Sequence, residues 1–198
     1  MRKLLLQGLI RRPVTEATPR LDEEGIAALA GRVDVAARRR LGRSLSIREV
    51  DAGSCNGCEL EIHALNNAIY DLERFGIRFV ASPRHADVLL VTGPLTLNMQ
   101  TALSRTYAAT PGPKWVVAVG DCAINGGVFA GSYAVADGIG GTVPIDLAIA
   151  GCPPAPEQLL SGLLILLESS SRTANQASPP AGPVSPPRAA RDRDSPSR

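Results

Sequence analysis

The sequence has few aromatic residues and no long apolar segment. Each of these shortages argues against one class of protein. Phe, Trp and Tyr make up 4% of the 198 residues, which suits a packed α/β interior better than a surface that stacks nucleic-acid bases. No apolar run approaches the roughly 20 residues of a transmembrane helix. A short apolar stretch near the start has no small-residue cleavage site directly after it, so we expect no secretory signal. We therefore expect a reducing compartment and no nucleic-acid partner.

The formal net charge is only +2, but it is unevenly distributed. Residues 1–50 carry 11 Lys and Arg against 6 Asp and Glu, whereas residues 51–172 carry 6 against 11. Residues 173–198 carry 4 against 2 and contain six prolines. We therefore predict a basic helical arm over 1–43, an acidic folded domain over 44–171, and a disordered Pro/Ser/Arg-rich tail over 172–198. The arm can meet an acidic partner or an anionic membrane face, or simply be a solvated helix surface.

Apolar runs alternate with segments of helical periodicity along the chain. The pattern predicts a sheet that is mostly parallel and covered by helices on both faces, since its strands are continuously apolar. Gly42 supplies a stop for the helix of the arm. The predicted strands cover 46–50, 77–81, 88–91, 115–119 and 143–150, and the predicted helices cover 21–41, 58–75, 98–109 and 156–168.

All four cysteines follow predicted strands. Cys55 and Cys58 come after the first strand, Cys122 after the run ending at Val119, and Cys152 after the run ending at Ala150. The carboxyl ends of parallel strands share one edge of the sheet, and open α/β sheets build their sites there. We therefore predict that the four thiols form one site.

Four thiolates at one edge can hold a 4Fe-4S cluster or a structural zinc ion. Zinc usually takes its cysteines from two CxxC knuckles, and this chain has only one. A thioredoxin-like pair at Cys55 and Cys58 would leave Cys122 and Cys152 unexplained, and disulfides are disfavoured in a reducing compartment. The neighbouring Gly57, Gly120 and Gly151 would let backbone approach a cluster, although each can also be an ordinary turn glycine.

Nine short motifs occur in a characteristic order around these cysteines. The motifs are Asn56–Gly57, Glu59–Ile62, Glu73–Gly76, Ser82–Asp87, Thr92–Thr96, Val119–Ala123, Gly126–Phe129, Val143–Asp146 and Gly151–Pro154. With them, the chain resembles the 20 kDa subunit family of respiratory complex I, the NADH-quinone oxidoreductase, over about residues 44–168. It is most similar there to the small subunit of membrane-bound group 4 nickel–iron hydrogenases, of the formate hydrogenlyase and hydrogenase-4 type.

The resemblance implies a flavodoxin-like fold and a single 4Fe-4S cluster on Cys55, Cys58, Cys122 and Cys152. It implies an electron-transfer subunit, not catalytic alone, at the cytoplasmic side of the cell membrane. Its partners would be a large catalytic subunit, a ferredoxin-like iron-sulfur subunit and membrane subunits. The large subunit carries a nickel–iron centre in hydrogenases, whereas the matching interface forms a quinone pocket in complex I. Complex I members have two adjacent cysteines at the first site, so the Cys55–Cys58 spacing favours the hydrogenase branch.

Three charged residues near these motifs are further candidates. Glu59 follows Cys58 directly and is a candidate proton relay, although an acid also favours the first turn of a helix. Arg84 can contact the cluster region or a partner carboxylate, or lie at an unrelated surface. Asp121 is expected to orient the Cys122 loop by accepting hydrogen bonds from backbone N–H groups. The alternatives for the whole chain are the 20 kDa subunit role in an NADH-quinone oxidoreductase and a structural four-cysteine zinc or scaffold protein.

Overall fold

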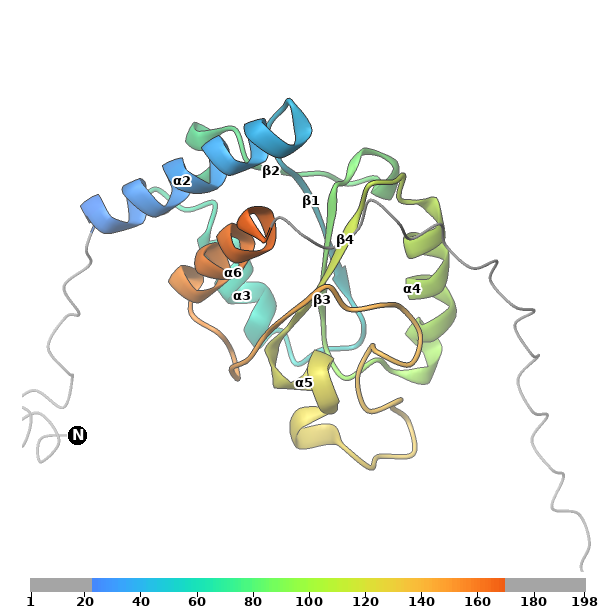
Figure 1. Cartoon of the computed structure of the whole chain (residues 1–198). Coiled ribbons are helices and arrows are strands. Elements are labelled where there is room, and N and C mark those ends of the chain that lie inside the picture. The colour runs from blue at the N-terminus through green and yellow to red at the C-terminus, as the bar shows by residue number, and fades with distance from the viewer. Residues whose placement is uncertain (1–22, 170–198) are drawn as a thin grey trace, which may run out of the picture.

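The computed structural model describes residues 23–169, so residues 1–22 of the predicted arm and all of the predicted tail, 172–198, lie outside it. Five strands alternate with helices along the described chain (Figure 1). The strands are β1 (Ser46–Asp51), β2 (Arg78–Phe79), β3 (Val88–Thr92), β4 (Trp115–Val119) and β5 (Leu147–Ile149). The helices are α2 (Glu23–Leu41), α3 (Gly57–Ala64), α4 (Leu97–Ala109), α5 (Gly120–Asn125) and α6 (Pro156–Glu168), with 3-10 turns η1 (Leu72–Phe75), η2 (Pro83–His85) and η3 (Gly127–Phe129).

The five strands form one sheet in the order β2-β1-β3-β4-β5, and every pairing is parallel. This is the strand order of flavodoxin-like folds. The carboxyl ends of β1, β3 and β4 are in register, with Val91 opposite both Val50 and Ala118. The predicted α/β class and flavodoxin-like sheet are therefore confirmed.

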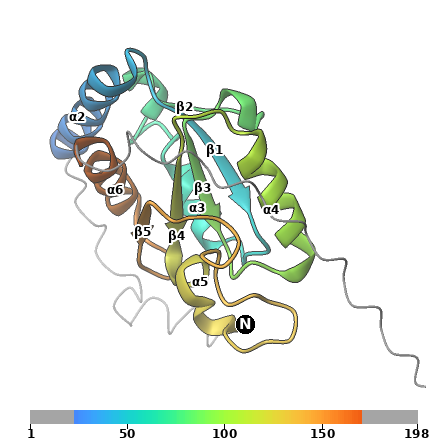
Figure 2. The ribbon, with the colours of Figure 1, turned by 45° about the vertical axis from the view of Figure 1, so that its right-hand side comes forward.

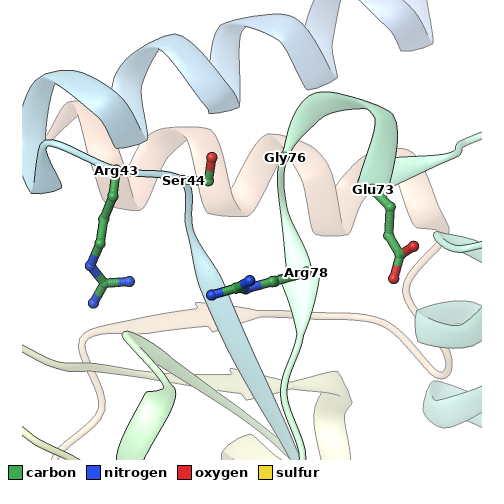
Figure 3. Close-up of a pocket in the computed structure, with 5 residues that line it drawn as sticks. All are labelled: Arg43, Ser44, Glu73, Gly76 and Arg78. Atoms are coloured by element: carbon green, nitrogen blue, oxygen red, sulfur yellow. The ribbon is translucent and has the colours of Figure 1, made fainter.

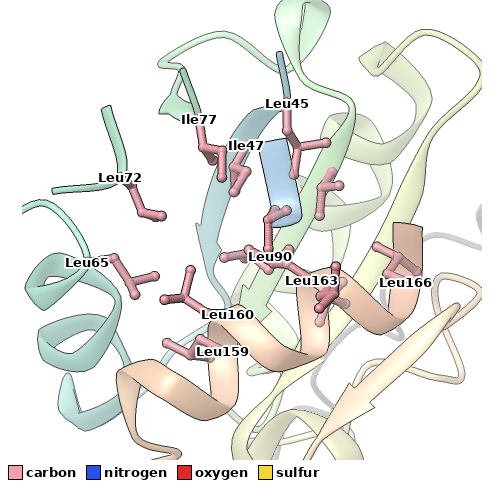
Figure 4. Close-up of a cluster of buried hydrophobic side chains, with 14 of the residues drawn as sticks. Leu45, Ile47, Leu65, Leu72, Ile77, Leu90, Leu159, Leu160, Leu163 and Leu166 are labelled. Atoms are coloured by element: carbon pink, nitrogen blue, oxygen red, sulfur yellow. The ribbon is translucent and has the colours of Figure 1, made fainter. Parts of the chain in front are cut away.

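Helices cover both faces of the sheet (Figure 2). On one face α2, α3 and α6 bury a leucine-rich cluster in which Ile47 and Leu90 of the sheet pack with Leu160 and Leu163 of α6 (Figure 4). On the other face α4 and the segment after α5 bury Leu89, Val91, Leu103 and Ile139. Because both faces are covered, β3 and β4 are buried at every position, as their uninterrupted apolar sequence predicts.

The basic helix of the arm is part of this packing. Ile26, Ala30, Val33 and Ala37 of α2 are buried in the leucine-rich cluster. Arg40 lies over the Trp115 ring, 4.7 Å from its centroid, and its Nη1 donates to the carbonyls of the last turn of α6. Such a cation satisfies the free carbonyls at a helix C-terminus. The described part of the arm is thus docked on the domain, and Arg40 is not simply solvated.

The predicted helix over 58–75 is wrong in its second half. α3 ends at Ala64, and only the separate turn η1 follows. The Asn67 side chain accepts hydrogen bonds from the N–H groups of Ile69 and Tyr70, and Asp71 has a positive φ of 43°. Asparagine competes with helical backbone bonds in this way. Leu65 and Leu72 are both buried, so apolar residues keep a helical spacing in the sequence although the helix itself ends at Ala64.

Two predicted strands are shorter than expected, and one helix was missed. Only Arg78–Phe79 of the run 77–81, and only Leu147–Ile149 of the run 143–150, pair in the sheet. Both are edge strands with one neighbour, which limits how far pairing extends. The missed helix is α5, which begins directly after β4 and contains Cys122. Its six residues are too few to show helical periodicity.

Candidate metal centre

The four cysteines lie at the carboxyl ends of three strands, as predicted. Cys55 and Cys58 follow β1, Cys122 lies in α5 after β4, and Cys152 follows β5. Cys122 is buried, Cys58 is half-buried, and Cys55 and Cys152 are exposed at the surface. All four are free thiols.

The thiols lie close enough to influence one another's ionisation. Burial raises the pKa of Cys58 to about 12, and the charges of Glu59 and of the other three cysteines contribute to this rise. Burial also raises the pKa of Cys122, with a contribution from Cys152 and Cys55. These shifts show that the four cysteine side chains are electrostatically coupled, because a charge on one thiolate disfavours ionisation of the next.

Glycines line the sulfur atoms of two of these cysteines. A Cβ added to Gly120, whose φ is +82°, would lie 2.7 Å from Cys58 Sγ. A Cβ added to Gly127, at φ +51°, would lie 2.9 Å from Cys122 Sγ. Backbone thus approaches the sulfurs more closely than any side chain would allow. This approach fits a cluster whose sulfurs are surrounded by main chain.

The loop that carries Cys55 is held by Asp51 at the end of β1. Asp51 Oδ1 accepts hydrogen bonds from the N–H groups of Gly53 at 2.7 Å and Ser54 at 2.8 Å. Ser54 Oγ in turn accepts from Asn56 N–H at 3.1 Å. Asn56 adopts a left-handed φ of 71°, which asparagine tolerates, and α3 begins at the next residue. The chain therefore turns directly from β1 through Cys55 into the helix that carries Cys58.

The loops of Cys122 and Cys152 are joined by a reciprocal pair of bonds. Asp121 N–H donates to Gly151 O, and Gly151 N–H donates to Asp121 Oδ1, both at 2.9 Å. Asp121 does accept a hydrogen bond from a backbone N–H group as expected, but the donor is Gly151 of the Cys152 loop and not a residue of the Cys122 loop. Val128 N–H also bonds to Cys122 sulfur, which lowers the pKa of that thiol against the larger effect of burial.

Within residues 23–169, no three His, Cys, Asp or Glu side chains are grouped closely enough to hold a single metal ion. A zinc ion needs four ligand atoms about 2–2.3 Å from one point. A 4Fe-4S cluster binds each thiolate to a separate iron at the corner of a cube, so its four sulfurs are set more widely. Four cysteine thiolates are the donor set that such a cluster requires.

Glu59 lies beside this site and is almost completely buried, with 5% of its surface exposed. Neither of its carboxylate oxygens has a hydrogen-bond partner in the described chain. Its charge acts on Cys58 and also raises the pKa of Glu49 on β1, where burial has the larger effect. Glu49 in turn lies 3.8 Å from the exposed His63 of α3. A buried carboxylate without partners needs a counterpart, because its isolation is energetically unfavourable.

The opposite edge of the sheet has a pocket that is remote from the cysteines. Its volume is about 510 Å³, and Arg43, Ser44, Glu73, Gly76 and Arg78 line it (Figure 3). Arg43 is already paired with the buried Asp87, at 2.6 Å. Arg84 is also exposed at this amino-terminal edge, in η2 just before β3. The suggestion that Arg84 contacts the cluster region is therefore wrong.

The family of the chain follows from comparison with known proteins. The family model described as NADH ubiquinone oxidoreductase, 20 Kd subunit, matches residues 55–166, a segment that begins at Cys55 and includes all four cysteines. The chain belongs to this family.

Relatives within the family come from hydrogenases and from quinone reductases. The chain is 43% identical to the probable membrane-bound hydrogenase subunit mbhJ of Pyrococcus furiosus, over 71% of this chain and 84% of that protein. It is 43% identical to formate hydrogenlyase subunit 7 of Escherichia coli, over 65% of this chain but only 51% of that protein. It is 47% identical to a subunit of the NADH-quinone oxidoreductase of Citrifermentans bemidjiense, over 60% and 69% of the two chains.

Solved structures agree with this placement. A chain of the archaeal membrane-bound sulfane sulfur reductase, a respiratory membrane complex, superposes with a TM-score of 0.57 at 36% identity, over 75% of both chains. A chain of an NAD+-reducing nickel–iron hydrogenase superposes with a TM-score of 0.50 at 21% identity, over 63% of this chain and 92% of that chain, and shows the shared fold. Among residues 23–169, no helix has both the length and the apolar character needed to cross a membrane.

Proposed function

We propose that the chain is an electron-transfer subunit that holds one 4Fe-4S cluster on Cys55, Cys58, Cys122 and Cys152. The observation that carries this proposal is the meeting of four free thiols at one sheet edge, with Gly120 and Gly127 backbone against two of the sulfurs. When bound, such a cluster accepts and releases single electrons. The sequence has no flavin or nucleotide fingerprint and no nickel–iron ligand set, so in this proposal the chain alone catalyses no reaction.

We propose further that the chain works in a membrane-associated hydrogenase-like complex, bound peripherally at the cytoplasmic side. There it relays electrons to or from a large catalytic subunit. A ferredoxin-like iron-sulfur subunit and membrane subunits would complete the complex. Two relatives support the proposed complex, since one is a probable membrane-bound hydrogenase subunit and the other a formate hydrogenlyase subunit.

The surface around the cysteines supports a partner at this edge. Five of the eight large apolar side chains that are exposed in the described chain lie here. Tyr133 is 95% exposed and Val128 is 78% exposed, and both follow α5. An apolar surface of this kind marks a protein-binding face. The five residues are Leu60, Leu97, Val128, Phe129 and Tyr133.

Within this complex, the residues of the chain have separate tasks. The four thiolates would each bind one iron of the cluster. Gly120 and Gly127 allow close backbone approach, and Val128 N–H donates toward a ligand sulfur. We assign Glu59 the role of a proton relay, because it is buried beside Cys58 and its oxygens have no partner in the described chain.

Metal analysis of the anaerobically purified protein separates this proposal from a structural zinc site. We expect about four irons and four inorganic sulfides per chain, with an EPR signal on reduction. Zinc without an EPR signal would overturn the electron-transfer role and leave a four-cysteine zinc or scaffold protein.

The second candidate is the 20 kDa subunit role in an NADH-quinone oxidoreductase, favoured by the 47% identical relative. Exposure of the purified complex to hydrogen distinguishes the two. A hydrogenase-like partner predicts that hydrogen gas alone produces the reduced-cluster EPR signal. A signal that appears with NADH or quinol but not with hydrogen would instead assign the quinone-linked role.

A further inference from the structure

Two aspartates join β4 to β5 in the same way, one at each end of the strand pair. At the amino end, Asp146 N–H donates to Val116 O at 2.9 Å, and Val116 N–H donates to Asp146 Oδ2 at 2.8 Å. At the carboxyl end, Asp121 and Gly151 exchange the corresponding two bonds at 2.9 Å. Each aspartate uses its backbone N–H as donor and its carboxylate as acceptor. Only the carboxyl-end pair adjoins cysteines.

Few other structural features of the described chain hold Cys152 in place. It is exposed, and the strand before it is three residues long and pairs with β4 on one side only. Cys122, in contrast, is buried within α5. Gly151 links the two cysteine loops. It is hydrogen-bonded to Asp121, the residue before Cys122, and it immediately precedes Cys152. The Asp121–Gly151 pair therefore sets where one ligand loop lies relative to the other.

The Asp121 carboxylate also brings charge to the site. It is half-buried, and it belongs to the residue directly before Cys122. Reduction adds an electron to a group that is already bound by four thiolates. A fixed negative charge nearby disfavours that added electron, because electrostatic interactions are stronger in a partly buried site than in water.

We propose that Asp121 is a positioning residue that fixes the Cys152 loop against Cys122 through its two bonds to Gly151, and that its carboxylate lowers the reduction potential of the cluster. This inference rests on the proposed cluster function. It assigns the residue no contact with iron and no part in proton transfer.

The geometric and electrostatic roles can be separated by two substitutions. In Asp121→Asn the side-chain oxygen still accepts the Gly151 N–H bond, but the charge is removed. In Asp121→Ala both the acceptor and the charge are lost. Asp146→Asn and Asp146→Ala are matched controls, because they change the same bonds between the same strands at the end without cysteines.

The experiment uses the full chain purified anaerobically within its complex, and measures iron content, EPR spectrum and reduction potential. We expect Asp121→Asn to keep the wild-type iron content and to shift the potential upward. Asp121→Ala should lose at least half of its iron, or show a changed EPR spectrum. Both Asp146 variants should match the wild type in all three measurements, even if their melting temperatures fall.

Two results would overturn the inference while leaving the cluster function intact. An unchanged potential in Asp121→Asn would refute the electrostatic role. Wild-type iron content and EPR spectrum in Asp121→Ala would refute the positioning role. A wild-type protein without iron would instead overturn the proposed function itself, and the inference with it.

Discussion

Gly120 lies so close to Cys58 that a Cβ at Gly120 would come within 2.7 Å of Cys58 Sγ. A free thiol can rotate away from such a contact, but a sulfur bound to iron cannot. Gly120 also has a φ of +82°, which strains any other residue. This close approach of the start of α5 to the start of α3 brings together two cysteine-bearing helices whose facing residues are 62 positions apart in sequence.

Replacing Gly120 with alanine should therefore prevent or weaken cluster binding. We expect Gly120→Ala to lose most of the iron and to destabilise the fold by about 1–3 kcal/mol. Gly141→Ala is the control, since a Cβ there meets no atom within 4 Å. Iron content per chain is the measurement, and equal iron in Gly120→Ala and Gly141→Ala would contradict the close approach.

Replacing Glu59 with glutamine tests the proton relay. Glutamine keeps the shape of the side chain but cannot carry a proton between partners. We expect Glu59→Gln to reduce the hydrogen turnover of the complex by about 100-fold, at the lower end of what a positioned acid or base contributes, without changing the cluster EPR signal. Glu61→Gln, two residues further and only half-buried, is the control. Turnover that is equal in the two variants would show that Glu59 moves no proton.

The ion pair of Arg43 with Asp87 should stabilise the amino-terminal edge of the sheet. Asp87 is 3% exposed and accepts two bonds from Arg43 and one from Ser46 N–H. Arg43→Ala would leave a buried carboxylate with a single backbone donor, so we expect a loss of about 2–3 kcal/mol in the free energy of unfolding. The exposed pair of Arg32 with Glu168 provides the control, and Arg32→Ala should change stability by less than about 1 kcal/mol. Chemical denaturation measures both, and equal losses would contradict this assignment.

The hydroxyl of Tyr70 joins the segment after α3 to the start of α6. It donates to Glu157 Oε1 at 2.7 Å, and burial followed by this bond raises the pKa of Tyr70 to about 12. Because the folded-state pKa exceeds the unfolded value of about 10, this contribution to stability is complete below about pH 10 and is lost as the pH rises toward about 12. Absorbance in the near ultraviolet follows tyrosinate formation. Subtraction of a Tyr70→Phe titration should remove a component near pH 12, and Glu157→Gln should shift that component downward.

The convergence of the cysteines could be predicted from sequence because it depends only on strand order. Each cysteine follows an apolar run, and parallel strands bring their carboxyl ends to one edge whatever the intervening loops do. The end of α3 could not be predicted, because Leu65 and Leu72 keep helical spacing while the Asn67 side chain accepts bonds from the N–H groups of Ile69 and Tyr70 that a continued helix would use. The Asp121–Gly151 hydrogen bonds could not be predicted from the sequence either. They join residues 30 apart, which become neighbours only after β4 and β5 have paired.

The most direct test of the proposed function is the cluster itself, measured in the wild type and in four single variants. Iron and sulfide content with EPR of the reduced protein should show one 4Fe-4S cluster in the wild type. Replacement of Cys55, Cys58, Cys122 or Cys152 with serine should each abolish or alter that signal, because each thiolate binds a different iron. Zinc in place of iron in the wild type, or a Cys122→Ser protein with unchanged iron content and EPR spectrum, would contradict the assignment of the cluster to these four residues.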